Sequence, residues 1–255
     1  MPKIQIPALK AEKPKPRTGR KIIAVLLLLF IALLAVLFFR SPVSRVSEIH
    51  FTGNTFNTDK QLIQKSGLEI GAQFFAVDTE ETEKRLTAIG TIKSAKVDKQ
   101  FPGVVNVNIV EHPTVAYELG KDGSLQAILA SGKSVPVSAS GIAVEKPILT
   151  QWDPKDPNKI KLSEVLADIP NSMTSDISEI IPSPTPSFPD RIKLYTRSRF
   201  EVITAVSLLR DKVGYLSQVT ETQQPGVITM LEADSYEPFK PEISAEESEE
   251  PSTQK

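Results

Sequence analysis

The most prominent feature of the hydrophobic pattern is an unbroken apolar run near the start of the chain. Residues 22–39 read IIAVLLLLFIALLAVLFF and contain no charge, glycine or proline. As a helix this run is about 27 Å long, which matches the hydrocarbon core of a bilayer. Helices in the core of a soluble protein are rarely apolar on every face over such a length. We therefore predict a single transmembrane helix over 22–39.

From residue 43 to residue 115 the pattern changes to short strands and amphipathic helices. Threonine or aspartate precedes acidic and polar residues at two points, which is typical of helix N-termini. Valine and isoleucine alternate with asparagine near the end of the segment, as in a strand with one buried face. The order is therefore β-α-α-β-β, which predicts a compact domain over 43–115. The expected elements are a strand over 43–51, helices beginning at Thr58 and Asp78, and strands over 92–99 and 105–109.

Residues 116–239 contain shorter strands, more turn residues and two amphipathic helices. Apolar residues recur every three or four positions in the helices and every second position in the strands. We predict a mixed β-sheet domain with flanking helices, so the folded part belongs to the α+β class. The expected elements are helices over 160–169 and 206–216 and strands over 192–196, 200–204 and 227–232.

The two ends of the chain have too little apolar content to form a core. Residues 1–21 are basic and contain several prolines, and residues 240–255 are acidic and polar. Such compositions cannot offset the entropy lost on folding, so both segments are expected to be disordered.

Basic residues are concentrated on one side of the apolar run. Seven Lys or Arg precede it against one acid, whereas Arg40 and Arg45 follow it. This bias predicts a single-pass type II protein of the cell membrane, with its N-terminus in the cytoplasm and its C-terminal domain outside. A cleaved signal peptide has the same charge order, but its apolar region is usually shorter and precedes small residues. Phe38, Phe39 and Arg40 occupy that place here, which favours an uncleaved anchor.

Charge and cysteine content exclude several classes of function. The first 40 residues carry a net charge of +7 and the whole chain −1, which leaves −8 for the outer part. An acidic outer part argues against nucleic acid as a partner. The chain has no cysteine, which excludes disulfides, thiolate metal sites and cysteine nucleophiles. An outer domain without disulfides suits a bacterial surface better than a eukaryotic secretory one.

The sequence offers little for catalysis or for binding cofactors and metals. His50 and His112 are its two histidines, and each stands alone at a predicted strand. Such histidines are more often structural or exposed than ligands or bases. Glu80, Glu81 and Glu83 lie at a predicted helix start, where acids complement the helix dipole. We therefore predict no enzymatic activity, no catalytic residue, no cofactor site and no metal site.

A set of collinear segments extends from the anchor to the last predicted strand. They are VSEIHFTGN at 46–54, IKSAKVDKQFP at 92–102, VNVNIVEHPTVA at 105–116, KPILT at 146–150, RIKLYT at 191–196 and GVITM at 226–230. Together with the anchor, this set resembles the DivIB/FtsQ family of bacterial cell-division proteins, and its details suit the DivIB branch of Gram-positive bacteria. The resemblance covers roughly residues 20–239, and it implies that the first folded domain is a POTRA domain.

The resemblance also implies that this protein acts as a scaffold at the division septum. Proteins of this family gather other single-pass divisome proteins of the FtsL/DivIC type and help to regulate septal peptidoglycan synthesis. Septal peptidoglycan synthases are therefore further partners to expect. The alternative is an envelope-facing sensor or accessory domain that binds a cell-wall ligand.

The partner-binding site is expected at the last predicted strand. A chain-terminal strand often lies at a sheet edge, where its unpaired backbone groups can accept a strand of a partner. The family resemblance points to the same C-terminal region. Apolar residues on both faces of 227–232 suit an interior strand instead, and this alternative stays open. The expected partner-binding residues are Ile228, Met230, Glu232, Asp234 and Tyr236.

Overall fold

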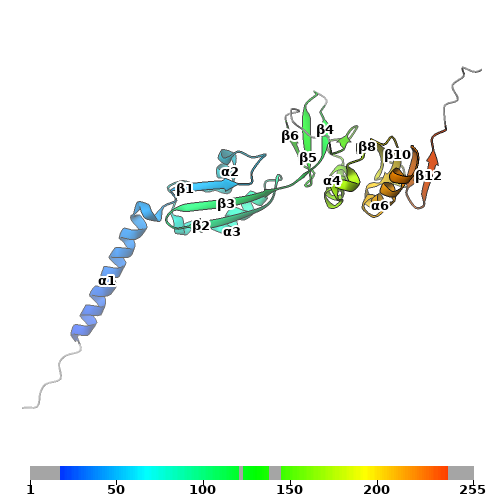
Figure 1. Ribbon diagram of the computed structural model, residues 1–255. Helices are drawn as coiled ribbons and strands as arrows, with labels where there is room; N and C mark the ends of the chain where they lie inside the picture. Colours follow the sequence, from blue (N-terminus) through cyan, green and yellow to red (C-terminus); the bar gives the residue numbers. More distant parts are fainter. Residues whose placement is uncertain (1–17, 121–122, 138–144, 241–255) are drawn as a thin grey trace, which may run out of the picture.

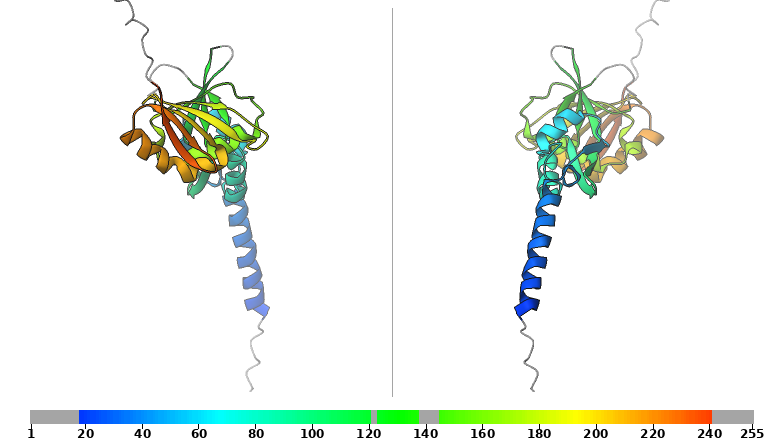
Figure 2. Two further views of the ribbon diagram at one scale, coloured as in Figure 1. Left: turned by 90° about the vertical axis from the view of Figure 1, so that its right-hand side faces the viewer. Right: turned by 90° about the vertical axis from the view of Figure 1, so that its left-hand side faces the viewer.

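The computed structural model describes residues 18–120, 123–137 and 145–240 of the 255-residue chain. A long helix, a three-stranded unit and a nine-stranded unit follow one another along the molecule (Figure 1). Two further views show the long helix projecting from one end of the folded part (Figure 2). The tails expected to be disordered lie outside the described residues, except that residues 18–21 belong to the long helix and residue 240 is described.

Helix α1 (Thr18–Arg40) contains the predicted membrane span. Its candidate span Gly19–Arg40 contains an 18-residue window with a mean hydropathy of 3.5, and none of that window is buried inside the protein. Among the described residues it is the one helix that is long and apolar enough to cross a membrane. A helix that is apolar on all sides and has no protein cover is stable in lipid, because its backbone hydrogen bonds are all internal.

The strands of the three-stranded unit lie in the order β1-β3-β2. Strand β1 is parallel to β3, and β2 is antiparallel to β3. The chain order is the predicted β-α-α-β-β, although the first strand is shorter than expected because residues 42–44 form a turn of 3₁₀ helix. The elements are η1 (Pro42–Ser44), β1 (Glu48–Thr52), α2 (Asp59–Ser66), η2 (Phe74–Ala76), α3 (Thr79–Thr87), β2 (Ile92–Gln100) and β3 (Val104–Glu111).

Capping residues and a small apolar core hold this unit together. The Thr58 and Asp78 side chains each accept a backbone N–H from the first turn of the helix that follows, as their sequence positions predict. Each helix then presents one fully buried leucine, Leu62 or Leu86, to the sheet. The sheet contributes Ile92, Val97, Val105, Val107 and Ile109 to the same core.

The nine-stranded sheet has the order β12-β11-β10-β9-β8-β7-β4-β5-β6. Its pairs are antiparallel except for three parallel ones: β4 with β7, β7 with β8, and β10 with β11. The strands are β4 (Thr114–Leu119), β5 (Leu125–Leu129), β6 (Ser134–Pro136), β7 (Ile148–Leu149), β8 (Ile177–Pro182), β9 (Arg191–Thr196), β10 (Glu201–Ala205), β11 (Gly226–Met230) and β12 (Asp234–Pro238). The helices are α4 (Pro157–Asp168), α5 (Asn171–Thr174) and α6 (Val206–Thr222).

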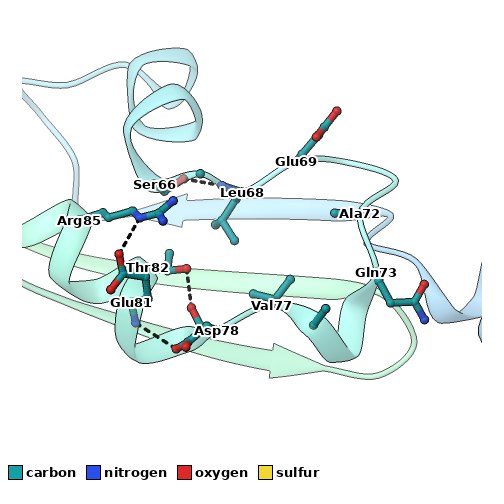
Figure 3. Close-up of a pocket in the computed structure, with 12 residues that line it drawn as sticks. Ser66, Leu68, Glu69, Ala72, Gln73, Val77, Asp78, Glu81, Thr82 and Arg85 are labelled. Carbon is teal, nitrogen blue, oxygen red and sulfur yellow. Dashed lines mark hydrogen bonds and ion pairs between the residues drawn. The ribbon is translucent and has the colours of Figure 1, made fainter.

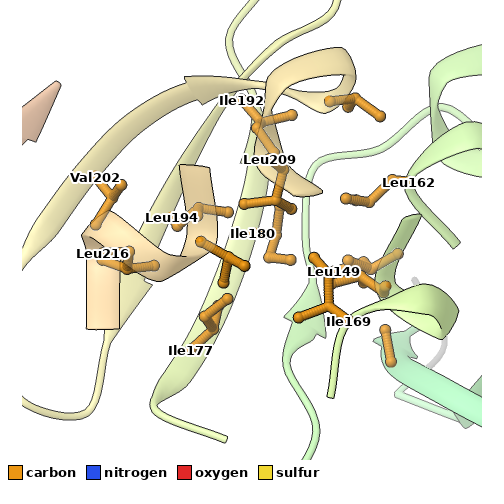
Figure 4. Packing of buried hydrophobic residues seen from close by; sticks show 14 of the residues in the cluster. Leu149, Leu162, Ile169, Ile177, Ile180, Ile192, Leu194, Val202, Leu209 and Leu216 are labelled. Atoms are coloured by element: carbon orange, nitrogen blue, oxygen red, sulfur yellow. The ribbon is translucent and has the colours of Figure 1, made fainter. Parts of the chain in front are cut away.

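The main hydrophobic core lies between this sheet and helices α4 and α6 (Figure 4). Leu162 from α4 and Leu209 from α6 are fully buried there. Alternate residues of the strands face them, which is the pattern of a sheet covered on one side. The strand residues include Ile177, Ile180, Ile192, Leu194, Val202, Ile228 and Met230.

The prediction for the last strand is wrong in one respect. The strand expected over 227–232 ends at Met230, and a further strand, β12, follows after a short turn. Strand β11 is therefore paired on both sides, with β10 and with β12. Its apolar residues on both faces were the sequence signal of this interior position, and the sheet edge belongs to β12.

The two units contact each other through a loop of the three-stranded unit. Phe56, in the loop before α2, packs on an apolar cluster of the nine-stranded unit that contains Ala127, Leu129 and Val135. The Glu111 carboxylate holds this loop in place by accepting the backbone N–H of Phe56 at 3.0 Å. These contacts restrict the relative motion of the two units, because separating them would expose the Phe56 ring.

Helix α6 begins without a capping residue of its own. Ala205 stands at its N-cap and has no side-chain acceptor. Asp190, from the loop before β9, takes this role, since its carboxylate accepts the Ser207 N–H at 2.9 Å and its carbonyl accepts the Val206 N–H. Burial raises the pKa of the Asp190 carboxyl, but hydrogen bonds from Ser207 outweigh it, so the pKa lies below its ordinary value.

We expect Asp190→Ala to destabilise the nine-stranded unit by about 1 kcal/mol at pH 7, because the amides at the start of α6 lose their acceptor. A carboxyl whose pKa is lowered by folding stabilises the native state above its unfolded pKa, about 3.9, and this contribution is lost as the pH falls through the folded value. The difference between wild type and variant should therefore shrink below about pH 4. Urea unfolding at pH 7 and pH 3.5 measures both effects.

The control for this experiment is Asp211→Ala, which removes an exposed acid from the same helix. Its effect on the free energy of unfolding should stay within about 0.5 kcal/mol. Equal losses in the two variants would show that Asp190 does not cap α6.

Candidate functional site

The sequence-predicted binding residues divide into a fully buried pair and three residues that reach the surface. Ile228 and Met230 on β11 are 0% exposed and belong to the main core. Neither side chain reaches the surface, so neither can contact a partner without unfolding the sheet. Glu232, in the turn after β11, is exposed. Asp234 and Tyr236 lie on β12, at the edge of the sheet.

Strand β12 presents one free side of its backbone. Phe239 donates its N–H to the Pro225 carbonyl oxygen at 3.2 Å, so residue 239 faces β11. In an antiparallel pair the direction of the backbone groups alternates, which turns residues 235 and 237 toward β11 and residues 234, 236 and 238 away from it. The free side therefore offers the N–H and C=O groups of Asp234 and Tyr236. Pro238, which has no N–H, stands at the next outward position, as expected for an edge strand.

Two side chains anchor β12 on the rest of the domain. The Tyr236 ring packs beside Phe200 with 6.3 Å between ring centroids, and its hydroxyl donates to the Gln224 carbonyl oxygen at 2.6 Å. Lys212 on α6 binds the Asp234 carboxylate at 2.6 Å and also donates to the Leu231 carbonyl oxygen. These contacts hold the strand in place while its outer side stays open.

The partnership of Asp234 with Lys212 distinguishes this acid from Glu232. Charge reversal at Asp234 would place two cations together and release the turn before β12. Charge reversal at Glu232 would change only an exposed surface. Glu232 and Glu237 are both exposed and give the edge an acidic border.

The three-stranded unit has its own pocket, of about 250 Å³, between the loop after α2 and the start of α3 (Figure 3). Several of its polar groups bond to neighbouring residues in the wall. Arg85 pairs with Glu81 at 3.0 Å, and the Asp78 carboxylate accepts the Glu81 N–H. Glu83 likewise accepts the Val97 N–H of β2 at 2.8 Å. Glu81 thus forms an exposed ion pair within α3, whereas Glu83 ties the helix to β2, a tertiary contact that its place at the helix start did not predict.

A buried ion pair is a feature that the sequence did not reveal. Lys159 on α4 is 4% exposed and contacts both oxygens of Glu118 on β4, at 2.7 and 2.6 Å. The two residues are far apart in the chain, so no local pattern marks them. A cavity of about 690 Å³ lies beside the pair and is lined in part by Leu149 and Trp152. Removal of one partner from such a pair would leave the other charge buried and unpaired, which is strongly destabilising.

The histidines are not brought together. His50 on β1 is exposed and lies 2.9 Å from the Glu48 carboxylate on its own strand. The backbone N–H of His112 donates to the Thr91 carbonyl oxygen at 2.9 Å. Within residues 18–120, 123–137 and 145–240, no group of three or more His, Asp or Glu side chains has a spacing that would hold a metal ion. The candidate site at β12 therefore presents backbone N–H and C=O groups rather than a set of reactive side chains.

An apolar anchor, a β-α-α-β-β unit and a larger sheet with an open edge define a class of membrane-anchored interaction protein. The family description "POTRA domain, FtsQ-type" matches residues 44–112. The chain is 61% identical to the cell division protein DivIB of Paenibacillus polymyxa, with 100% of each chain covered. It is 31% identical to DivIB of Brevibacillus brevis, with 92% of this chain and 90% of that chain covered. The chain therefore belongs to the DivIB family of cell division proteins.

A solved structure of the major extracytoplasmic domain of DivIB from Geobacillus stearothermophilus also matches. The match has a TM-score of 0.37 and 21% sequence identity, and it covers 43% of this chain and 91% of that chain.

The open edge of β12 predicts an alternating pattern of amide exchange. The outward N–H groups of Asp234 and Tyr236 should exchange at least about tenfold faster than the inward ones of Ser235, Glu237 and Phe239, because only the inward groups are bonded to β11. Residue-resolved hydrogen exchange by NMR on the full chain in nanodiscs measures this. If the outward amides exchanged as slowly as the inward ones, another segment would have to cover the edge.

Proposed function

We propose that this protein is a non-catalytic scaffold of the division machinery and that it captures partners through the edge of β12. The observation that carries the proposal is the free side of this strand at the end of a nine-stranded sheet. Membership of a cell division family indicates that the protein acts in cell division, and α1 anchors it in the membrane. A membrane-anchored protein with an open strand is suited to assembling other membrane proteins.

The mechanism is addition of a partner strand to β12. The N–H and C=O groups of Asp234 and Tyr236 would pair with the backbone of the incoming segment. Pro238 has no N–H to contribute, so donors from this side end at Tyr236. Glu232 and Glu237 lie beside the path of that segment, and their charge would speed its approach if it is basic.

The proposed partners are other single-pass divisome proteins of the FtsL/DivIC type, and septal peptidoglycan synthases. The proposed orientation places the N-terminus in the cytoplasm and the folded domain outside. It is supported by the seven basic residues before the span, against the two that follow closely after it. Under this arrangement, the protein gathers at the division septum and influences the enzymes that build the septal wall.

Location distinguishes the scaffold from a sensor of the cell wall. A fluorescent protein fused to the cytoplasmic N-terminus should concentrate at midcell in dividing cells, because a scaffold accumulates with its partners. The comparison is with a fusion to α1 alone, which should spread evenly around the membrane. An even distribution of the full-length fusion would contradict the scaffold and favour the envelope-facing sensor.

The role of the β12 edge is tested by a matched pair of variants at one residue. Tyr236→Pro removes the outward N–H, and Tyr236→Ala removes the same side chain but keeps the N–H. We expect Tyr236→Pro to lower co-purification of FtsL/DivIC-type partners at least about tenfold relative to Tyr236→Ala, because a partner strand loses a backbone bond and meets the proline ring. Both variants should give similar melting temperatures, since this N–H does not bond to β11. Equal capture by the two variants would place the interface elsewhere.

A further inference from the structure

The end of α1 nearest the folded part is surrounded by phenylalanine rings from three separate segments. Phe38 and Phe39 lie on α1, Phe75 on η2, and Phe101 in the turn between β2 and β3. The Phe75 ring centroid lies 5.9 Å from that of Phe38 and 6.0 Å from that of Phe39. The Phe101 centroid lies 6.4 Å from that of Phe38 and 6.1 Å from that of Phe75. We call these four residues the phenylalanine patch.

The rings from the folded part are not core residues. Phe75 and Phe101 are each 51% exposed, whereas their neighbour Phe74 is 4% exposed and belongs to the core of the three-stranded unit. Successive residues of η2 thus point in opposite directions, one inward and one toward the surface. A contiguous exposed apolar patch of this kind marks an interaction surface rather than a scatter of surface residues.

Backbone hydrogen bonds hold both loops against the segment that leaves α1. The Val46 N–H donates to the Ala72 carbonyl oxygen at 2.8 Å, which ties down the loop that carries Phe75. The Ser47 N–H donates to the Gly103 carbonyl oxygen at 2.8 Å, which ties down the turn that carries Phe101. Gly103 has a φ of +75°, and a Cβ there would lie 2.5 Å from the Arg45 carbonyl oxygen. This close approach requires glycine, so the position of the turn is specified by the chain.

The depth of α1 in the membrane sets the depth of the patch. The apolar run ends at Phe39, so Phe38 and Phe39 lie where the hydrocarbon core meets the headgroups. Phe75 and Phe101 are held close to these rings and therefore lie at the same level. Arg40 and Arg45, both exposed, flank this level with positive charge that anionic headgroups would bind.

We propose that the phenylalanine patch docks the POTRA domain on the membrane surface, with Phe75 and Phe101 inserted among the lipids at the interface. The occupant is the lipid itself, because the patch continues the lipid-facing surface of α1 without a break. A domain attached through one helix alone would swing about its linker. Two additional apolar contacts from separate loops fix its tilt, and so they fix the direction in which the distant β12 edge points (Figure 1).

The test uses the natural absence of cysteine. Single variants Phe75→Cys and Phe101→Cys of the full chain carry a nitroxide label in nanodiscs of phosphatidylcholine and phosphatidylglycerol, one copy per disc. The nitroxide collides with oxygen, which concentrates in the bilayer, and with a charged nickel chelate, which stays in water. The ratio of the oxygen collision rate to the nickel collision rate therefore rises with the depth of the label in the bilayer. Both labels should give ratios at least about threefold above that of Val110→Cys. Val110 is 50% exposed, about as much as Phe75 and Phe101, but it lies at the end of β3 far from the phenylalanine patch.

A second label keeps the patch intact. Gln100→Cys is exposed and adjacent to Phe101, so its label should also report lipid contact. Adding Phe75→Ser and Phe101→Ser to this variant should return its ratio to the Val110 level while the melting temperature changes little. Ratios equal to that of Val110 at all three sites would overturn the proposal. A ratio that rises only when two copies share a disc would overturn it too, because the patch would then bind a second chain.

Discussion

The packing of α6 on the nine-stranded sheet is the interaction on which the C-terminal half of the molecule depends. The chain leaves β10, crosses the sheet as α6 and returns as β11 parallel to β10. A parallel return requires such a crossover, and it buries Leu209 of the helix against Ile228 and Met230 of the strand. Because β11 is formed inside the sheet, the chain can add one more strand by a simple turn. That strand, β12, is the one that we propose a partner binds.

The start of α6 shows how tertiary contacts complete a local structure. Its own N-cap, Ala205, supplies no acceptor, and Asp190 reaches it from a distant loop. About one turn further along, Arg210 of α6 forms a surface ion pair with Asp168 at the end of α4. Lys212 of α6 binds Asp234 and the Leu231 carbonyl oxygen, and it thereby connects the helix to the turn before β12. One helix thus organises both the core and the position of the edge strand.

The two proposed interaction surfaces lie at opposite ends of the molecule. The phenylalanine patch lies where α1 meets the POTRA domain, and β12 lies at the far end of the nine-stranded sheet (Figure 1). The tilt of the POTRA domain at the membrane can set the direction of β12 only if the junction between the two domains is stiff. Phe56, packed on Leu129 and held through Glu111, provides a contact of that kind. The arrangement suits a protein that presents a binding strand at a set distance from the membrane.

The sequence by itself determined the anchor, the caps of α2 and α3, and the α+β order of the first domain, because these depend on local periodicity and on hydrogen bonds a few residues apart. It also carried the family resemblance. Only the tertiary structure decided which strand lies at the edge. The place of 226–230 near the chain end favoured an edge strand and its two apolar faces favoured an interior one, so the sequence alone did not decide between them. The segment DSYEP at 234–238 has too little apolar character to be predicted as a strand. Its stability comes from backbone bonds to β11, from Tyr236 on Phe200 and from Lys212, and pairings over such distances leave no periodic signal in the chain.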